Sequence, residues 1–139
     1  MRFVAGQTAL LAIILALPRR RSFEPRLGGV LVAAGGLLAL AGIAALGRSL
    51  TPLPEPRGGG ELVEHGPYRL VRHPIYGGGL LAATGWSLRR SPAALAPTAL
   101  LAALWTAKAR REEELLVARF PGYADYRRRT PHRFVPWLV

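Results

Sequence analysis

The chain has 139 residues, half of them hydrophobic, with 19 Lys and Arg against 8 Asp and Glu, a formal charge of +11 and no cysteine. This length allows one domain. The apolar content excludes a disordered basic tail, and the lack of cysteine excludes a disulfide-stapled secreted domain. Two classes remain: a basic soluble domain that binds an acidic partner, or a membrane protein whose charges lie in its loops.

Four stretches without a charged side chain favour the membrane class: Phe3–Pro18, Leu27–Gly47, His73–Leu88 and Ser91–Ala107. A helix needs about 20 apolar residues to cross the hydrocarbon core, with a usable range of about 17–25. Leu27–Gly47 meets this length by itself and has no polar face, whereas the other three are shorter. We therefore expect an all-α integral membrane helical bundle of about four transmembrane helices, some of them short, and a C-terminal cytoplasmic helical segment.

The chain is expected to form a single membrane domain over residues 1–139, with two spans in 1–47 and a motif region with two further spans and a tail in 48–139. The first stretch could instead be a signal peptide, since Arg2 precedes it. No small-x-small cleavage site follows Leu15–Leu17, and the chain continues into the basic run PRRR at 18–21. We therefore predict a retained span.

Four crossings would place the N-terminus, the Arg48–Tyr76 loop and the tail from Lys108 on one side of the membrane. That side carries thirteen Lys and Arg residues, and the opposite side six. The positive-inside bias predicts that the loop and the tail are cytoplasmic, in an inner cell membrane. The net charge then reflects topology and attraction to anionic lipid, and no nucleic-acid partner is expected.

Proline and glycine mark the joints between these elements. Pro18–Arg26 predicts a short basic hairpin, and Arg48–Gly60, with three prolines and three final glycines, predicts irregular chain. Pro74 is expected to open the third span, with His73 near its N-cap, because proline suits the first turn of a helix. The glycine pairs at 28–29 and 35–36 favour close helix packing.

The end of the chain is predicted to be helical in two pieces. Pro92 is expected to open the fourth span, which continues out of the membrane after Ala107. Gly122 then breaks this helix before the short segment YADYRRR. No dinucleotide or P-loop motif is present, and the three histidines, 65, 73 and 132, have neither an i, i+4 partner nor a cysteine, so no metal site is expected.

Two polar clusters stand out from this background: residues 68–76 (YRLVRHPIY) and Lys108–Glu114. The first could be interfacial anchoring by Arg and Tyr. The second could be a solvated helix face, with i, i+4 pairs Lys108–Glu112 and Arg110–Glu114. Because the third and fourth spans form a hairpin, both clusters emerge on the same side. We expect a helix N-terminus, a histidine, two tyrosines and two or three glutamates to converge there.

The pattern RHPIYGG at 72–78, preceded by LVEHGPY at 62–68 and followed by Glu112-Glu113, resembles the isoprenylcysteine carboxyl methyltransferases and the related phospholipid N-methyltransferases. The tail continues the likeness with Leu116, Phe120, Tyr123, Tyr126, Arg127–Arg129 and Pro131. The resemblance covers Arg48 to Pro136.

This resemblance implies a methyltransferase that uses S-adenosylmethionine, bound from the cytosol by membrane helices. It implies cofactor binding by Leu62, Val63, Tyr68, His73, Pro74, Ile75, Tyr76, Glu112 and Glu113, and substrate binding by Arg72 and Lys108. Lys108 stands where the prenylcysteine enzymes have arginine, so the charge is kept but the bidentate fork for a carboxylate is lost.

The chemistry of the cofactor fits these residue types. Its carboxylate suits the N-terminus of the third span, its hydroxyls and ammonium suit Glu112 and Glu113, and Tyr68 or Tyr76 could pack on the adenine or sulfonium. A lipophilic acceptor would enter between helices from the bilayer. A carboxylate acceptor needs no base, whereas an amine needs one, and His73 is the imidazole at hand. The catalytic residue stays open.

Three other functions stay open as well. One is a membrane binding module of the same fold without turnover, and another is a membrane reductase that uses a nicotinamide cofactor. The third is a basic membrane-surface protein with no small-molecule site.

Overall fold

A computed structural model of the chain describes residues 2–18, 24–47 and 62–136, and every regular element in these ranges is a helix. The elements are α1 (Arg2–Ala16), α2 (Pro25–Leu46), η2 (Gly66–Arg69), α3 (Pro74–Arg90), η3 (Pro92–Ala94), α4 (Leu95–Arg119) and α5 (Tyr123–Arg129). The all-helical class is confirmed. Among the described helices, α2 alone is long and apolar enough to cross a membrane, with a mean hydropathy of 2.3, so the four-span arrangement stays a prediction.

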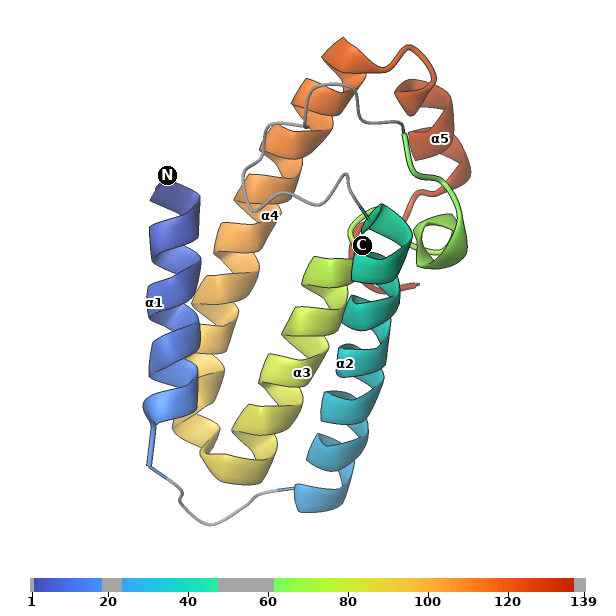
Figure 1. Ribbon diagram of the computed structural model, residues 1–139. Helices are drawn as coiled ribbons and strands as arrows, with labels where there is room; N and C mark the ends of the chain where they lie inside the picture. The colour runs from blue at the N-terminus through green and yellow to red at the C-terminus, as the bar shows by residue number, and fades with distance from the viewer. Residues whose placement is uncertain (1, 19–23, 48–61, 137–139) are drawn as a thin grey trace.

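Helices α1 to α4 lie side by side, and each runs opposite to the one before it (Figure 1). Helix α2 packs along α3, and α1 packs along α4. The N-terminus of α1, the C-terminus of α2, the N-terminus of α3 and the end of α4 therefore share one end of the molecule, together with η2 and α5. The two polar clusters of the sequence meet at this end.

The helix boundaries follow the proline and glycine signals closely. Helix α3 begins at Pro74 with His73 as its N-cap, as predicted. Pro92 opens the short helix η3 rather than α4, which begins at Leu95. Helix α4 continues past Ala107 to Arg119, and α5 covers the predicted YADYRRR segment. The predicted irregular segment Arg48–Gly60 and most of the Pro18–Arg26 hairpin lie outside the described residues.

Glycines spaced seven residues apart let α2 and α3 approach closely. A Cβ atom added to Gly35 would lie 2.4 Å from the carbonyl oxygen of Gly78, and one added to Gly28 would lie 2.6 Å from that of Gly85. Gly36 has no neighbour within 4 Å of such an atom. The predicted close packing is therefore confirmed for Gly28 and Gly35, one glycine of each pair, because these two face α3.

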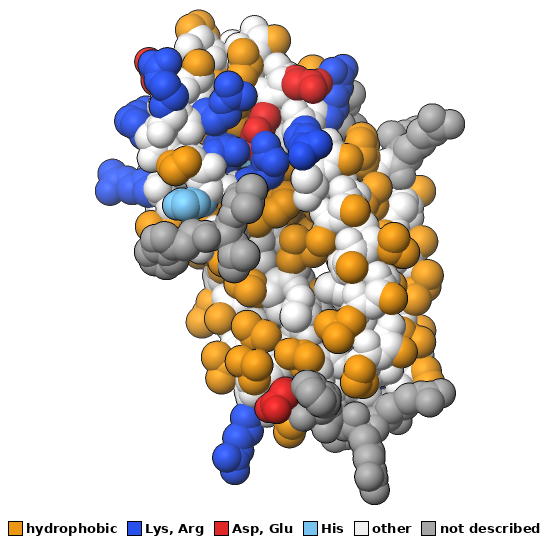
Figure 2. Space-filling view, turned by 180° about the vertical axis from the view of Figure 1, so that it is seen from behind, with side chains coloured by type: hydrophobic (Ala, Val, Ile, Leu, Met, Phe, Trp, Pro, Cys, Tyr) orange, Lys and Arg blue, Asp and Glu red, His pale blue; other side chains and the backbone are white. Residues whose placement is uncertain are grey.

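On the face that Figure 2 shows, hydrophobic side chains cover the length of the helices, and most charged side chains gather at the end that carries α5, with a few at the opposite end. On α2, Val30, Leu37 and Leu40 are 65%, 70% and 64% exposed. Inside the bundle, Ile14, Leu101 and Trp105 form the centre of the core, between α1 and α4. The core is thus small, and much apolar surface faces outward.

Candidate functional site

His73 lies between two carboxylates at the charged end of the bundle. Its Nε2 atom is 3.1 Å from Oε1 of Glu113, and its Nδ1 atom is 3.4 Å from Oε2 of Glu112. The N-cap position of α3 puts the imidazole opposite the part of α4 that carries both glutamates. A neutral imidazole has one N–H group, so contact with both carboxylates favours the doubly protonated form.

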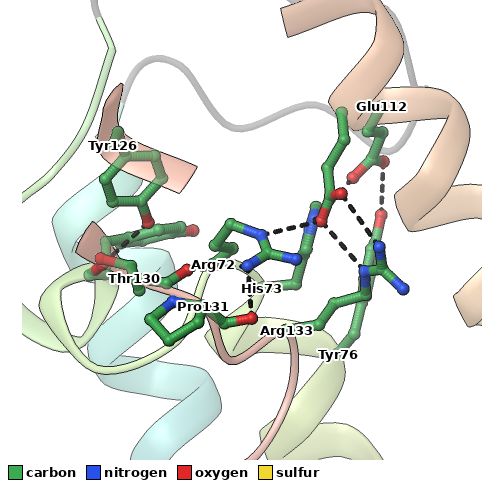
Figure 3. Close-up of polar contacts among 10 residues, drawn as sticks. Arg72, His73, Tyr76, Glu112, Tyr126, Thr130, Pro131 and Arg133 are labelled. Carbon is green, nitrogen blue, oxygen red and sulfur yellow. Dashed lines mark hydrogen bonds and ion pairs between the residues drawn. The ribbon is translucent and has the colours of Figure 1, made fainter. Parts of the chain in front are cut away.

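Glu113 is held entirely by protein groups. Its carboxylate accepts hydrogen bonds from Nε of Arg72, from Nε and Nη2 of Arg133, each at 3.0 Å, and from His73. Its side chain is 6% exposed. Arg72 extends this cluster by donating to the carbonyl oxygens of Thr130 and Pro131 (Figure 3). Three of these donors act on Oε1 and one acts on Oε2, so Glu113 is bound mainly by the protein and its burial limits access to a ligand.

The two ionisable groups at the centre of this cluster are shifted in opposite directions. Burial alone would raise the pKa of the Glu113 carboxyl, but hydrogen bonds from His73, Arg133 and Arg72 hold it well below its usual range. Burial alone would lower the pKa of His73, but hydrogen bonds to Glu112 and Glu113 outweigh it, so the pKa of His73 is raised. Both shifts favour the charged forms.

Residues 131–136, which we call the C-terminal strap, close the site against the start of α3. The backbone N–H groups of Arg72 and His73 donate to the carbonyl oxygens of His132 and Arg133. The ring of Phe134 lies edge-on to those of His73 and Tyr76, at centroid distances of 6.1 and 6.3 Å. The strap passes so close to α3 that a Cβ atom at Gly77 would lie 1.9 Å from the Phe134 carbonyl oxygen.

This strap covers the helix end that the sequence offered to the cofactor carboxylate. The first turn of α3 is crowded by the carbonyl oxygen of Phe134 rather than open to an anion. The N-terminus of α3 can bind a carboxylate only if the strap moves aside. The cationic side chains nearby are therefore better partners for the carboxylate of the cofactor.

Unlike Glu113, Glu112 can accept further hydrogen bonds. Its Oε1 atom accepts a 2.6 Å hydrogen bond from the hydroxyl group of Tyr76, and its Oε2 atom faces His73 (Figure 3). Its side chain is 15% exposed. Two donors leave about half of the lone-pair sites of a carboxylate open. Glu112 is therefore the acidic group of the site that can accept hydrogen bonds from a ligand.

The ring of Tyr76 is occupied within the protein. It stacks with the rings of His73 and Trp105 at centroid distances of 5.6 and 5.2 Å. The ammonium group of Lys108 lies 5.2 Å from its centroid. The expected packing of Tyr76 on the cofactor would need these contacts to open, so its clear role in this geometry is to hold Glu112 through its hydroxyl group.

Gln7 of α1 adds a polar contact to the site. The Oε1 atom of Gln7 accepts hydrogen bonds from Nε1 of Trp105 at 3.2 Å and from Nζ of Lys108 at 3.3 Å. Lys108 is 1% exposed. A buried ammonium group among apolar helices is costly, so it marks a functional position more often than a surface lysine does.

The structure brings together most of the residues for which the sequence predicted a role. Tyr68, Arg72, His73, Tyr76, Lys108, Glu112 and Glu113 lie at this end of the bundle. Pro74 and Ile75 instead pack against Gly42 of α2. Leu62 lines a separate surface pocket of about 620 Å³ beside Tyr126, Thr130 and the exposed ion pair between Glu64 and Arg129. Val63 is half-buried and does not line this pocket.

The solvated-face interpretation is wrong for both glutamates at the site, since Glu113 is buried and Glu112 is half-buried and bound by Tyr76. The predicted pair between Arg110 and Glu114 is replaced by an i, i+3 pair between Arg111 and Glu114, at 3.0 Å. Arg111 and Glu114 lie on the exposed side of α4, whereas Glu112 and Glu113 face α3 and the strap.

Sequence reasoning missed the residues that complete the site from a distance: Gln7, Trp105, Arg133 and Phe134. For Gln7 a signal was available, since it is one of two uncharged polar residues in an otherwise apolar helix. Polar residues in such helices are rare and mark functional positions. The strap gave no comparable signal, since its role depends on its pairing with residues 72 and 73.

Comparison with known sequences decides the family. The pattern of the family described as phospholipid methyltransferase matches residues 23–122, which is most of the chain. The chain belongs to this family. The match covers α2, α3 and α4, and it includes His73, Tyr76 and both glutamates of the site.

Two curated relatives share part of the chain. The cobalt-zinc-cadmium resistance protein CzcN of Cupriavidus metallidurans is 43% identical over 77 residues, which are 52% of this chain and 35% of that protein. The nickel-cobalt-cadmium resistance protein NccN of Alcaligenes xylosoxydans xylosoxydans is 38% identical over 76 residues, 53% of this chain and 36% of that protein. The similarity thus spans about a third of each relative. Within residues 2–18, 24–47 and 62–136, no group of three or more His, Asp or Glu side chains could hold a metal ion.

Proposed function

We propose that the chain is a membrane methyltransferase that transfers a methyl group from S-adenosylmethionine to a lipophilic carboxylate or amine at the cytoplasmic face of the membrane. The observation that carries this proposal is the geometry of Glu112. It is a half-buried carboxyl group with unused hydrogen-bonding capacity, held by Tyr76 and His73, inside the region that matches the phospholipid methyltransferase family.

The residues present fit this cofactor. A carboxylate such as Glu112 can accept hydrogen bonds from ribose hydroxyl groups or an ammonium group, and it attracts the positive charge of a sulfonium. The cofactor supplies an activated methyl group when it is bound. What the protein must then do is hold the acceptor in line with that methyl group and exclude water. Lys108, held by Gln7 on the membrane-facing side of Glu112, is the group that would bind an anionic acceptor.

The pattern of exposure supports a location in the membrane. Helix α2 is long and apolar enough to span the hydrocarbon core, and only 11% of its apolar stretch is buried inside the protein. A soluble core helix with this composition would be covered. The alternating directions of α1 to α4 place both described ends of the chain at the charged end of the bundle, as four crossings require.

The direct test is calorimetric titration of the purified full-length chain in nanodiscs with S-adenosylmethionine. Binding by the wild type and a loss of roughly one to two orders of magnitude in affinity for Glu112→Ala are expected, since hydrogen bonds to charged groups contribute about 1.5–3 kcal/mol. Glu114→Ala is the matched control on the same helix. It removes an exposed ion pair, and its affinity should change less than about twofold.

The same titration separates the alternatives. Binding of NADPH in place of S-adenosylmethionine would support a reductase, and binding of neither would leave a protein without this small-molecule site. Because two relatives are named as metal-resistance proteins, Co²⁺ and Cd²⁺ form further arms. Metal binding without binding of S-adenosylmethionine would overturn the proposal. Turnover is tested by transfer of a labelled methyl group to an extract of membrane lipids.

A further inference from the structure

The C-terminal strap contributes to the site although it lies outside the part of the chain that matches the family, residues 23–122. Arg133 donates two of the four hydrogen bonds to Glu113, from Nε and Nη2, and its side chain is 20% exposed. The backbone fixes Arg133 as well, because its carbonyl oxygen accepts from the N–H group of His73 at 2.8 Å. Arg133 is thus bound to the site through both its backbone and its side chain.

Glu113 is shared between Arg133 and His73. Its Oε1 atom accepts from Nε of Arg133 at 3.0 Å and from Nε2 of His73 at 3.1 Å. The other nitrogen of His73 faces Glu112. The guanidinium group of Arg133 therefore acts on His73 in two ways. It partly neutralises the Glu113 carboxylate that His73 also contacts, and its own positive charge repels the imidazolium. Both effects make the imidazolium less stable than it would be without Arg133.

We propose that Arg133 is a positioning residue that sets the pH at which His73 loses its proton, and thereby the pH at which Glu112 becomes free to bind a cationic ligand. This inference rests on the proposed function for the identity of that ligand. An imidazolium donates to Glu112 and competes with a bound cation for the same carboxylate. When His73 is neutral and donates to Glu113, the competition ends.

Among the residues that the structure describes, the charged and titratable groups around His73 come from α3, α4 and the chain segments beside them. Helix α4 contributes Glu112 and Glu113, and the chain before α3 contributes Arg72, which binds the same oxygen of Glu113. The hydroxyl group of Tyr76 binds Glu112, and Lys108 lies over the Tyr76 ring. Arg72 remains in the absence of Arg133, so Glu113 stays ionised and paired while its hold on His73 strengthens.

The test is the titration of the His73 side chain by NMR in the full-length chain, assigned by its loss in His73→Gln. In Arg133→Gln the midpoint should rise by about one pH unit, because an opposing charge is removed from the pair. Arg129→Gln is the matched control from the same tail. Arg129 forms a 2.9 Å ion pair with Glu64 on the surface, with 65% of its side chain exposed, and its loss should leave the midpoint unchanged.

A second variant keeps the test decisive. Arg133→Lys retains the charge without the fork, so the midpoint should rise less than in Arg133→Gln. An unchanged midpoint in either variant, even with a lower melting temperature, would mean that Arg133 only stabilises the fold, and the inference would be overturned. If Arg133→Gln does not fold, Arg133→Lys alone carries the test.

The ligand readout is separate from this one. Affinity of the wild type for S-adenosylmethionine should rise with pH as His73 loses its proton, and in Arg133→Gln this rise should move to higher pH by the same interval as the NMR midpoint. A wild type that does not bind the cofactor at any pH overturns the proposed function but leaves the titration result intact. A pH profile of binding that is identical in both proteins overturns the inference alone.

Discussion

The charged end of the molecule buries polar side chains, whereas helix α2 exposes apolar ones. At the site, Arg72, His73, Lys108 and Glu113 are at most 8% exposed, whereas on α2 the side chains of Val30, Leu37 and Leu40 are about two thirds exposed. In water both arrangements would be unfavourable. In the proposed membrane location, lipid would surround the exposed apolar side chains of α2, whereas the polar side chains lie in a closed interior at the charged end.

The charges at the site are stable only as a set. Burying an ion pair removes both ions from water, and this cost is offset only when each partner is fully hydrogen-bonded. Glu113 meets this condition through Arg72, Arg133 and His73. The surface pairs of the same region, such as Arg111 with Glu114, need no such arrangement because water solvates them. Four predictions test this contrast.

The largest effect is expected for Glu113→Ala. It would leave Arg72, Arg133 and the His73 imidazolium buried without their shared counter-charge, and breaking a buried pair in this way costs about 3–5 kcal/mol. The free energy of unfolding in detergent measures it. Glu114→Ala, one position along the same helix, should cost less than about 0.5 kcal/mol. Equal effects for the two would show that the cluster does not hold the fold together.

The lipid side of the contrast is tested by placing a charge on α2. Leu37 lies near the middle of the helix and is 70% exposed, so Leu37→Lys should disfavour membrane insertion by about 2.5–3.5 kcal/mol. Leu70 is a matched control, because it is 60% exposed but lies just after η2 at the charged end. Leu70→Lys should insert like the wild type. Insertion is measured as the membrane-bound fraction of newly made protein. Similar insertion of both variants would place α2 in water.

The sequence predicted the helices well because their boundaries are encoded locally. Pro74 begins α3, Gly122 separates α4 from α5, and each signal acts within a few residues. The convergence of the two polar clusters also followed from local information, since a short turn between α3 and α4 brings the two helix ends together.

The parts that could not be predicted depend on contacts between distant residues. Glu112 and Glu113 are adjacent in sequence, and only the packing of α3 and the strap gives Glu113 four donors and leaves Glu112 with capacity for a ligand. Arg133 reaches Glu113 from the tail, and Gln7 reaches Lys108 from α1. No spacing rule connects such residues. The central residues of the site were therefore predictable, but neither the distant residues that complete it nor the division of roles between the two glutamates was.

The glycines between α2 and α3 give the third prediction. A Cβ atom at Gly35 would meet the Gly78 carbonyl oxygen at 2.4 Å, so Gly35→Ala must push the helices apart, at a cost of about 1–3 kcal/mol. Its neighbour Gly36 faces open space, and Gly36→Ala should stabilise the helix by about 0.5–1 kcal/mol. Unfolding in detergent should thus show effects of opposite sign for two adjacent glycines. Effects of the same sign would contradict the close approach of α2 and α3.

The smallest effect is the dependence of stability on pH through His73. Its pKa is raised in the folded protein, since its contacts with Glu112 and Glu113 outweigh the effect of burial. The folded state therefore binds the proton more tightly than the unfolded chain, whose histidine has a pKa of about 6.5. The resulting stabilisation is complete below about pH 6.5 and is lost as the pH rises through the pKa of the folded state. Its size is about 1.4 kcal/mol for every pH unit that separates the folded pKa from the unfolded one. Glu113, whose pKa is lowered, stays ionised throughout this window and adds no slope.

The melting temperature of the wild type should therefore fall as the pH rises above about 6.5 and through the raised pKa of His73, because the folded state loses this proton there. His73→Gln has no titratable side chain at this position, so its melting temperature should decline less steeply with pH than that of the wild type. Scanning calorimetry of both proteins in detergent at a series of pH values measures the difference. A decline of equal steepness in His73→Gln would assign the proton to another group and remove His73 from the centre of the buried cluster.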